Sequence, residues 1–290
     1  MKGQTAMYTK IDGKEVSAAV RERITAETAK LKEKGVTPGL AVIIVGNDPA
    51  SRIYVNNKKK GCEQTGMNSF EYALPEETTT EELLELIEKL NADEQVDGIL
   101  CQLPVPKHID EVRVLNAISP AKDVDAFHPV NCGKVMTGDY TFVPCTPAGM
   151  VEMLKYYNIP ITGKHCVIIG RSNIVGKPMA MLMLKNNATV TVCHSKTENL
   201  SEITRQADIL VAAVGIAKFV TADMVKDGAV VLDVGMDRTE DGKLCGDVDF
   251  DNVKDKTSFI TPVPGGVGPM TITMLLQNTL SSAKNRANKQ

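Results

Sequence analysis

The stretch HCVIIGRSNIVGKPMAMLMLKNN, residues 165–187, decides the fold of the second half of the chain. An apolar run rich in β-branched residues ends at Ile169, a glycine-bearing turn follows, and apolar residues then recur at helical spacing. This order predicts a buried strand, a turn, and a helix that begins near Ile174 or Val175. The amides and dipole of such a helix end point to where a pyrophosphate binds.

The turn matches the dinucleotide-binding fingerprint G-x-G-x-x-G only in part. Gly170 fits, Ser172 holds the place of the second glycine, and Gly176 lies one residue beyond the third. Taken alone, the match leaves two interpretations open, a dinucleotide site and a plain strand–turn–helix unit.

The end of the next predicted strand, TVTVC at 189–193, bears on which dinucleotide would bind. NAD-binding folds usually carry an acidic residue about 20 residues after the fingerprint, to hold the ribose hydroxyls. Residues 194–197 contain no carboxylate. Arg171, Ser195 and Lys196 could instead contact a 2′-phosphate, which favours NADP over NAD, although Lys196 fits a solvated surface lysine equally well.

Short apolar runs alternate with helical patterns along most of the chain, as in parallel α/β proteins. Predicted strands begin at Leu40, Ser69 and Val96 in the first half, and the second half contains HCVIIG, TVTVC, ADILVAAV, GAVVLDV and SFIT. The fold class predicted is therefore two α/β domains with a cleft between them. The second domain is a Rossmann-like, doubly wound parallel sheet.

The domain boundaries follow from where this alternation stops and restarts. Residues 1–147 are predicted to form the first domain, completed by a C-terminal amphipathic helix within 270–290, and residues 148–269 form the second. From Pro104 to Pro147 the chain is rich in proline and poor in periodic apolar residues. Such a stretch predicts a functional irregular segment, with disorder as the alternative.

Composition and charge exclude several functional classes. A net charge of -3 over 290 residues gives no electrostatic reason to expect nucleic acid or a membrane surface as partner. Charges interrupt every apolar stretch short of the roughly 18 residues that span a bilayer, and the N-terminus lacks a signal-type apolar core, so a cytoplasmic location is expected. The seven cysteines and four histidines show no zinc-ligand spacing, which predicts packed, reduced thiols and no metal site.

The segment YVNNKKK, residues 54–60, contains the first candidates for chemistry. On a helix, positions four apart differ by about 40° in azimuth, so Tyr54 and Lys58 share a face. Lys59 and Lys60 turn away from that face and are expected in solvent. Periodicity alone does not decide whether Lys58 is solvated too.

Other candidates stand where predicted strands end. Gln102 follows the strand in VDGILC, at the carboxyl edge where α/β sites are built. Asp123 and Asp125 lie on alternate sides of an extended chain. Such carboxylates form turns, face cations at the surface, or hold a heterocycle that presents adjacent N–H donors. Gly215 and Gly235 end later strands, where a missing side chain either admits a cofactor or marks a turn.

Several segments taken together, in order and over almost the whole chain, resemble the bifunctional methylenetetrahydrofolate dehydrogenase/cyclohydrolase family. They are YVNNKKK, DGILCQLPVPKH, KDVDAFHPVN, PCTPAGM, IIGRSNIVGKPMA, TVTVCHSKT, VVLDVGMDR, GDVDF and TPVPGGVGPMTI. The resemblance implies NADP-dependent oxidation of methylenetetrahydrofolate, then hydrolysis of the methenyl product to formyltetrahydrofolate in the same interdomain cleft. It also implies a homodimer, associating through an exposed strand of the nucleotide domain.

The resemblance further implies roles for particular residues. Lys58 is the principal catalytic residue, Tyr54 packs against and orients the folate, Gln102 hydrogen-bonds near Lys58, and Asp125 holds the pterin. The positions that match cofactor contacts are Gly170, Arg171, Ser172, Ser195 and Met236. The positions that approach the folate and the nicotinamide are Pro264, Gly265 and Gly266. Ala126 stands where the family has glycine and Cys101 where valine is common, but neither change removes a functional group.

The hydrolysis reaction sets a requirement on the pKa of Lys58. A lysine with a reference pKa of about 10.4 serves as base or proton shuttle near neutrality only if burial or a nearby cation lowers that pKa. The cationic methenyl intermediate would act in this direction.

Two rival functions remain. One rival is an NADP dehydrogenase of the shikimate-dehydrogenase kind, and the other is a catalytically silent nucleotide-binding sensor.

Overall fold

The computed structural model describes residues 8–239 and 241–288, which divide into two compact units. The first unit contains residues 18–145 and 272–288. The second unit contains the described residues of 8–17 and 146–271. Residues 1–7, part of the N-terminus considered above for a signal, lie outside the described residues. No described helix has the length and apolar character needed to cross a membrane.

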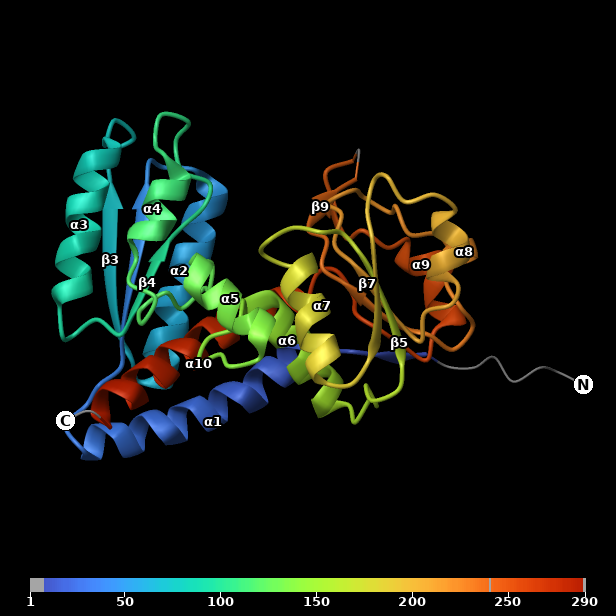
Figure 1. Cartoon of the computed structure of the whole chain (residues 1–290), viewed down its shortest axis with the longest axis horizontal. Coiled ribbons are helices and arrows are strands. Elements are labelled where there is room, and N and C mark those ends of the chain that lie inside the picture. Colours follow the sequence, from blue (N-terminus) through green and yellow to red (C-terminus); the bar gives the residue numbers. More distant parts are fainter. Residues whose placement is uncertain (1–7, 240, 289–290) are drawn as a thin grey trace, which may run out of the picture. The chain divides into compact units, whose positions relative to one another are not determined.

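The first unit is built on a three-stranded parallel sheet in the order β3-β2-β4 (Figure 1). Its strands are β2 (Gly39–Val45), β3 (Asn68–Leu74) and β4 (Gly98–Cys101). Its helices are α2 (Pro49–Thr65), α3 (Thr80–Ala92), α4 (Glu111–Ala117) and α5 (Pro129–Thr137), with most of α1 (Gly13–Glu33) and α10 (Val267–Ala287). Apolar residues of α3 and α4 pack on the strands in one core cluster. Every residue of β2 is buried, as in a sheet covered on both faces.

The second unit is built on a six-stranded parallel sheet in the order β1-β11-β8-β7-β5-β6. The strands are β1 (Thr9–Lys10), β5 (His165–Ile169), β6 (Thr189–Cys193), β7 (Ile209–Ala212), β8 (Val230–Asp233) and β11 (Phe259–Ile260). The helices are α6 (Cys145–Tyr156), α7 (Gly176–Lys185), α8 (Leu200–Thr204) and α9 (Phe250–Val253). β9 (Asp237–Arg238) and β10 (Leu244–Cys245) form an antiparallel pair.

The strand order of the second unit locates its ligand-binding edge. β6 and β7, the next two strands in the chain, lie on opposite sides of β5, so the strand order reverses at β5. Doubly wound sheets bind ligands at this switch point. The predicted fold class, with two α/β parts and a Rossmann-like second sheet, is confirmed.

Local elements differ from prediction in three places. The stretch from Pro104 to Pro147, expected to be irregular, contains α4 and α5, which are too short to show apolar periodicity. The last helix begins at Val267, before the expected 270, whereas α7 begins at Gly176 directly after its N-cap Val175, in agreement with the expected start. Residues 8–17 belong with the second unit because β1 pairs with β11, and β1, with two residues, is too short to be predicted from the sequence.

Candidate functional site

Lys58, Gln102 and Asp125 meet at the carboxyl edge of the first unit's sheet. The Nζ atom of Lys58 donates a hydrogen bond to Gln102 Oε1 at 2.6 Å. Asp125 is near enough to Lys58 for each charge to shift the pKa of the other group. The structure thus brings together three of the four residues to which the resemblance gave catalytic roles.

Local structure fixes the Lys58–Gln102 contact from both sides. Asp48 Oδ2 accepts from Ser51 N at 2.7 Å and caps α2, which carries Lys58 inward with only 7% of its surface exposed. Gln102 N donates to Ile43 O at 2.8 Å and so continues the pairing of β4 with β2. The side-chain Nε2 of Gln102 donates to Leu103 O at 2.6 Å, which turns Oε1 toward the lysine.

Burial shifts both titratable groups toward their neutral forms. Burial lowers the pKa of Lys58, and attraction to Asp125 opposes that shift in part. Burial raises the pKa of Asp125 to about 6; Lys58 opposes this shift and Asp123 adds to it. The Lys58 amine therefore gives up its proton more readily than a free lysine, and the neighbouring Asp125 carboxyl titrates close to neutrality. General acid–base catalysis requires pKa values near the operating pH.

The two aspartates of DVDAF have separate tasks. Asp123 is buried and accepts hydrogen bonds from His128 N and Asn131 Nδ2, both at 2.8 Å. These bonds hold the loop. Asp125 Oδ1 instead accepts from the Cys145 thiol at 3.5 Å, and the charge of Lys58 lowers the pKa of the Asp125 carboxyl. The turn-forming interpretation holds for Asp123, and Asp125 takes no part in these loop bonds.

Tyr54 lies on α2 one turn before Lys58, and burial raises the pKa of its phenol. Lys59 and Lys60 are exposed, which confirms that they are solvated neighbours. Cys145 was predicted only as a packed thiol, yet its contact with Asp125 makes it part of the site. No spacing in the sequence signals this, because the two residues stand 20 positions apart.

Gly170 and Gly176 shape the turn at the carboxyl end of β5. Gly170 has a φ of +126°, and a Cβ there would lie 2.2 Å from Ala213 O. A Cβ on Gly176 would lie 2.2 Å from Gly170 O. Gly176 therefore serves the close strand–helix packing of the third fingerprint glycine, although it stands one residue late. Ser172 Oγ accepts from the Gly176 amide at 3.3 Å and holds the turn.

The residues predicted to contact a 2′-phosphate gather at one sheet edge. Ile169 pairs with Cys193, so β5 and β6 end side by side. Arg171, Ser195 and Lys196 follow these strand ends and are exposed. With no carboxylate in residues 194–197, this edge fits a phosphorylated ribose.

The remaining predicted residues lie in loops of the second unit. Gly215 is exposed with a φ of +68°, and Met236 is 56% exposed. Gly235 is buried, and a Cβ there would lie 2.7 Å from Asp247 Oδ1. Its missing side chain thus makes room for Asp247, so packing accounts for this glycine.

The Pro264–Gly266 turn lies against the start of α1. Gly13 N donates to Gly265 O at 2.9 Å, and a Cβ on Gly13 would lie 1.7 Å from Gly266 O. Pro264 is exposed and Gly266 is buried. A Cβ on Gly266 would lie 2.5 Å from Pro262 O, so close backbone packing explains this glycine of PVPGGVGP.

Two family models match successive parts of the chain. The catalytic domain of tetrahydrofolate dehydrogenase/cyclohydrolase matches residues 11–125, and its NAD(P)-binding domain matches residues 144–287. The chain belongs to the tetrahydrofolate dehydrogenase/cyclohydrolase family. The resemblance drawn from the sequence is confirmed, and so is the nucleotide-binding assignment of the second half. The match excludes the shikimate-dehydrogenase alternative.

Similar proteins cover nearly the whole chain. The bifunctional protein FolD of Acetivibrio thermocellus is 60% identical over 96% of this chain and 97% of its own. The crystal structure of FolD from Campylobacter jejuni has a TM-score of 0.94 at 53% identity, covering 96% of this chain and 99% of its own. FolD from Trypanosoma brucei, solved with NADP cofactor and an inhibitor, has a TM-score of 0.91 at 40% identity, covering 96% of this chain and 98% of its own.

Among the described residues, no group of His, Cys, Asp and Glu is arranged to hold a metal ion.

Proposed function

We propose that the protein oxidises 5,10-methylenetetrahydrofolate to 5,10-methenyltetrahydrofolate with NADP, and then hydrolyses that product to 10-formyltetrahydrofolate. The observation that carries the proposal is the buried Lys58 amine, held by Gln102 beside Asp125, in a chain of this family. Bound NADP supplies the hydride acceptor of the first reaction. The second reaction depends on the chain's own side chains.

Lys58 moves the proton during hydrolysis. Its burial favours the neutral amine, and the positive charge of the methenyl substrate favours that form further. The neutral amine takes a proton from the water that attacks the methenyl carbon; the bond from that carbon to N5 then breaks, N5 takes up a proton, and the oxygen loses its second proton to become the formyl carbonyl. Gln102 holds Nζ in place through the 2.6 Å bond, so the base is oriented before the substrate arrives.

Asp125 and Tyr54 bind the folate in this proposal. Asp125 accepts hydrogen bonds from the adjacent N–H donors of the pterin, and the half-buried Tyr54 ring packs against the substrate. The carboxyl pKa of about 6 leaves Asp125 largely ionised near neutrality and so able to accept.

The second unit binds NADP in this proposal. The turn from Gly170 to Ser172 takes the pyrophosphate, and Arg171 and Ser195 contact the 2′-phosphate. Support comes from the exposed cation and hydroxyl at one sheet edge and from the NADP complex of the Trypanosoma brucei relative. The loop positions assigned to the cofactor are Gly215, Gly235 and Met236, and those assigned to the folate and nicotinamide are Pro264, Gly265 and Gly266.

An absorbance assay tests both activities at once. Purified protein is mixed with methylenetetrahydrofolate and either NADP or NAD, and reduced cofactor and methenyl product are followed separately. Reduced cofactor, formyl product and little methenyl accumulation are expected with NADP. Absence of turnover with either coenzyme would leave the silent nucleotide-binding sensor as the better description.

The assembly proposed is a cytoplasmic homodimer that pairs through an exposed strand of the second unit. β6 is the last strand in its sheet, and its Val192 is 37% exposed. An open strand edge is a template for pairing with another chain. Sedimentation equilibrium tests the proposal, with a dimer expected for the native chain and more monomer for Val192→Lys.

A further inference from the structure

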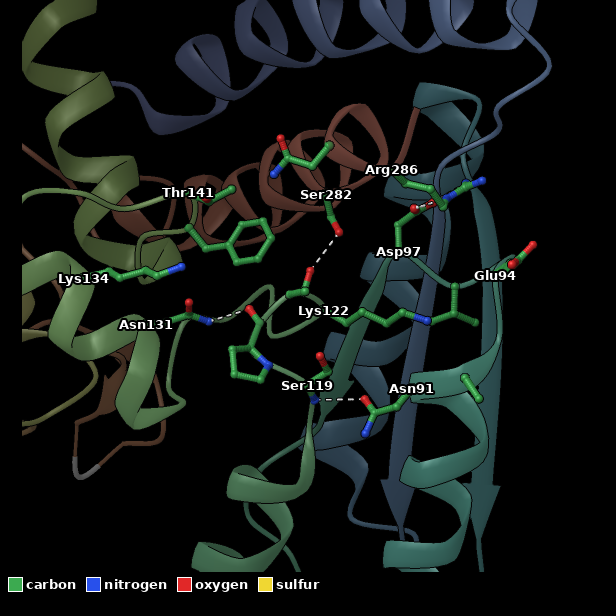
Figure 2. A pocket seen from close by; sticks show the side chains of 16 residues that line it. Asn91, Glu94, Asp97, Ser119, Lys122, Asn131, Lys134, Thr141, Ser282 and Arg286 are labelled. Carbon is green, nitrogen blue, oxygen red and sulfur yellow. Dashed lines mark hydrogen bonds and ion pairs between the residues drawn. The ribbon is translucent and has the colours of Figure 1, made fainter. Parts of the chain in front are cut away.

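The segment that carries Asp125 forms one wall of a cavity of about 710 Å³ in the first unit (Figure 2). The polar side chains around this cavity hold the wall. Asn131 Nδ2 donates to Pro120 O at 2.9 Å, Ser282 Oγ donates to Ala121 O at 3.0 Å, and Asn91 Oδ1 accepts from Ser119 N at 2.9 Å. We call residues 119–125 the Asp125 segment. Its first half is fixed by these bonds.

One side chain of α10 also holds the second half of the Asp125 segment, beyond Asp123. Asn278 is buried, with 5% of its surface exposed. Its Nδ2 donates to Val124 O at 2.8 Å and to Val143 O at 2.9 Å. The same atom lies 3.7 Å from Cys145 Sγ. Both amide hydrogens are thus committed to the two loops that place Asp125 and Cys145.

We infer that Asn278 is a positioning residue for folate binding and acts through Asp125; this inference rests on the proposed role of Asp125. Val124 O belongs to the peptide bond that joins Val124 to Asp125, so its bond to Asn278 sets the direction in which the Asp125 side chain leaves the backbone. The bond to Val143 O holds Cys145, two residues on, at hydrogen-bond distance from Asp125 Oδ1. Among the described residues, the hydrogen bonds of the Asn278 side chain reach neither Lys58 nor Gln102.

Loss of the amide would remove the Asn278 donor from Val143 O and would leave Val124 O with only the weak Cys145 thiol, at 3.5 Å, in a buried place. Such groups are satisfied by a shift of the backbone, because an unmade buried hydrogen bond is costly. A shift of the 124–125 peptide moves the carboxylate away from its position for the pterin. Misplacement of a binding group by about 1 Å can reduce catalysis as much as about 100-fold.

The test compares Asn278→Ala with Ser282→Ala. Ser282 lies one turn later on α10 and also donates to the Asp125 segment, but at Ala121 and away from the carboxylate. For Asn278→Ala, the tetrahydrofolate dissociation constant measured by calorimetry should rise about tenfold, which corresponds to the loss of one or two hydrogen bonds. NADP affinity should stay within about twofold. Ser282→Ala should lower the melting temperature about as much as Asn278→Ala does. It should leave the dissociation constants for tetrahydrofolate and NADP unchanged.

Asn278→Ser is the second variant, and it keeps the test decisive if the alanine variant folds poorly. Its hydroxyl can donate to one carbonyl, so folate affinity should lie between wild type and alanine. Folate affinity equal to wild type in folded Asn278→Ala or Asn278→Ser, with only a lower melting temperature, would overturn the inference and leave a purely structural asparagine.

A double-mutant cycle with Asp125→Asn separates the two proposals. If Asn278 acts through Asp125, adding Asn278→Ala to Asp125→Asn should weaken folate binding by less than about twofold more. Additive effects would overturn the route through Asp125. Unchanged folate affinity in Asp125→Asn alone would overturn the proposed role of Asp125 and this inference with it, whereas a loss in Asp125→Asn but not in Asn278→Ala would overturn the inference alone.

Discussion

Asp125 in the first unit and Asp233 in the second are aspartates whose pKa values burial raises, to about 6 and about 7. Their partners differ. Asp233 accepts from Gly235 N and Asp247 N at 2.9 Å and from Val248 N at 3.0 Å. Among the described residues, the side-chain hydrogen-bond donor to Asp125 Oδ1 is the weak Cys145 thiol, at 3.5 Å.

This difference separates a structural carboxyl group from a candidate binding group. The oxygens of Asp233 are taken up by three backbone amides that join the loops around β8. Asp125 keeps acceptor capacity and lies beside a buried amine. A raised pKa therefore does not mark a functional residue until its hydrogen-bond partners are counted.

Replacement of Lys58 should have the largest effect. Lys58→Ala removes the proposed base and should lower cyclohydrolase activity by at least about 100-fold, while NADP still binds. The control is Lys59→Ala, which removes an exposed charge from the same helix and should keep wild-type activity. Methenyltetrahydrofolate hydrolysis followed by absorbance measures both. If Lys58→Ala hydrolysed methenyltetrahydrofolate at the full rate, the buried Lys58–Asp125 pair would have a structural role, like Asp233.

Replacement of Gly176 tests the second unit's edge. A Cβ there would lie 2.2 Å from a backbone oxygen, so the turn proposed to bind the pyrophosphate must move. Gly176→Ala should raise the NADP dissociation constant at least about tenfold, a free-energy change typical of an overpacked contact. Calorimetric titration with NADP measures this. Unchanged affinity would show that the turn does not contact the cofactor.

Replacement of Asp233 should affect stability and its pH dependence. Asp233→Asn puts an amide where a backbone N–H needs an acceptor, which should lower the free energy of unfolding by about 1 to 2 kcal/mol. In the native chain the pKa of Asp233 is raised, so its contribution to stability is complete below 3.8 and is lost as the pH rises through about 7.

Thermal unfolding at pH 5 and pH 8 measures both effects. Between these values the native chain should lose stability from Asp233, and the asparagine variant should lose less. Titration of Asp125 also lowers stability as the pH rises through about 6. Because Asp125 is present in both proteins, this loss is common to them. An equal loss in the two proteins would contradict the assignment of a raised pKa to Asp233.

Replacement of Gly133 should have the smallest effect and serves as the control for Gly176. Gly133 lies in α5, is exposed, and has no atom within 4 Å of a Cβ placed on it. Gly133→Ala should raise the free energy of unfolding by about 0.5 to 1 kcal/mol, because alanine loses less backbone entropy in a helix. Urea unfolding measures it. Destabilisation would mean that α5 requires this glycine.

The sequence by itself determined the features that depend on local periodicity and strand ends. The alternation of apolar runs predicted both sheets, the spacing of Tyr54 and Lys58 put them on one helix face, and Gln102 was expected at the carboxyl edge where it lies. The roles given to these residues stay predictions, although family membership is shown.

Only the tertiary structure decided which polar groups meet. It assigned Asp123 to the loop and turned Asp125 toward Lys58, and it filled the space at Gly235 with Asp247. Asn278 contacts carbonyl groups 135 and 154 residues away in the chain. Periodicity carries no information about such contacts, because they depend on how separate elements pack and which buried carbonyl then lacks a donor.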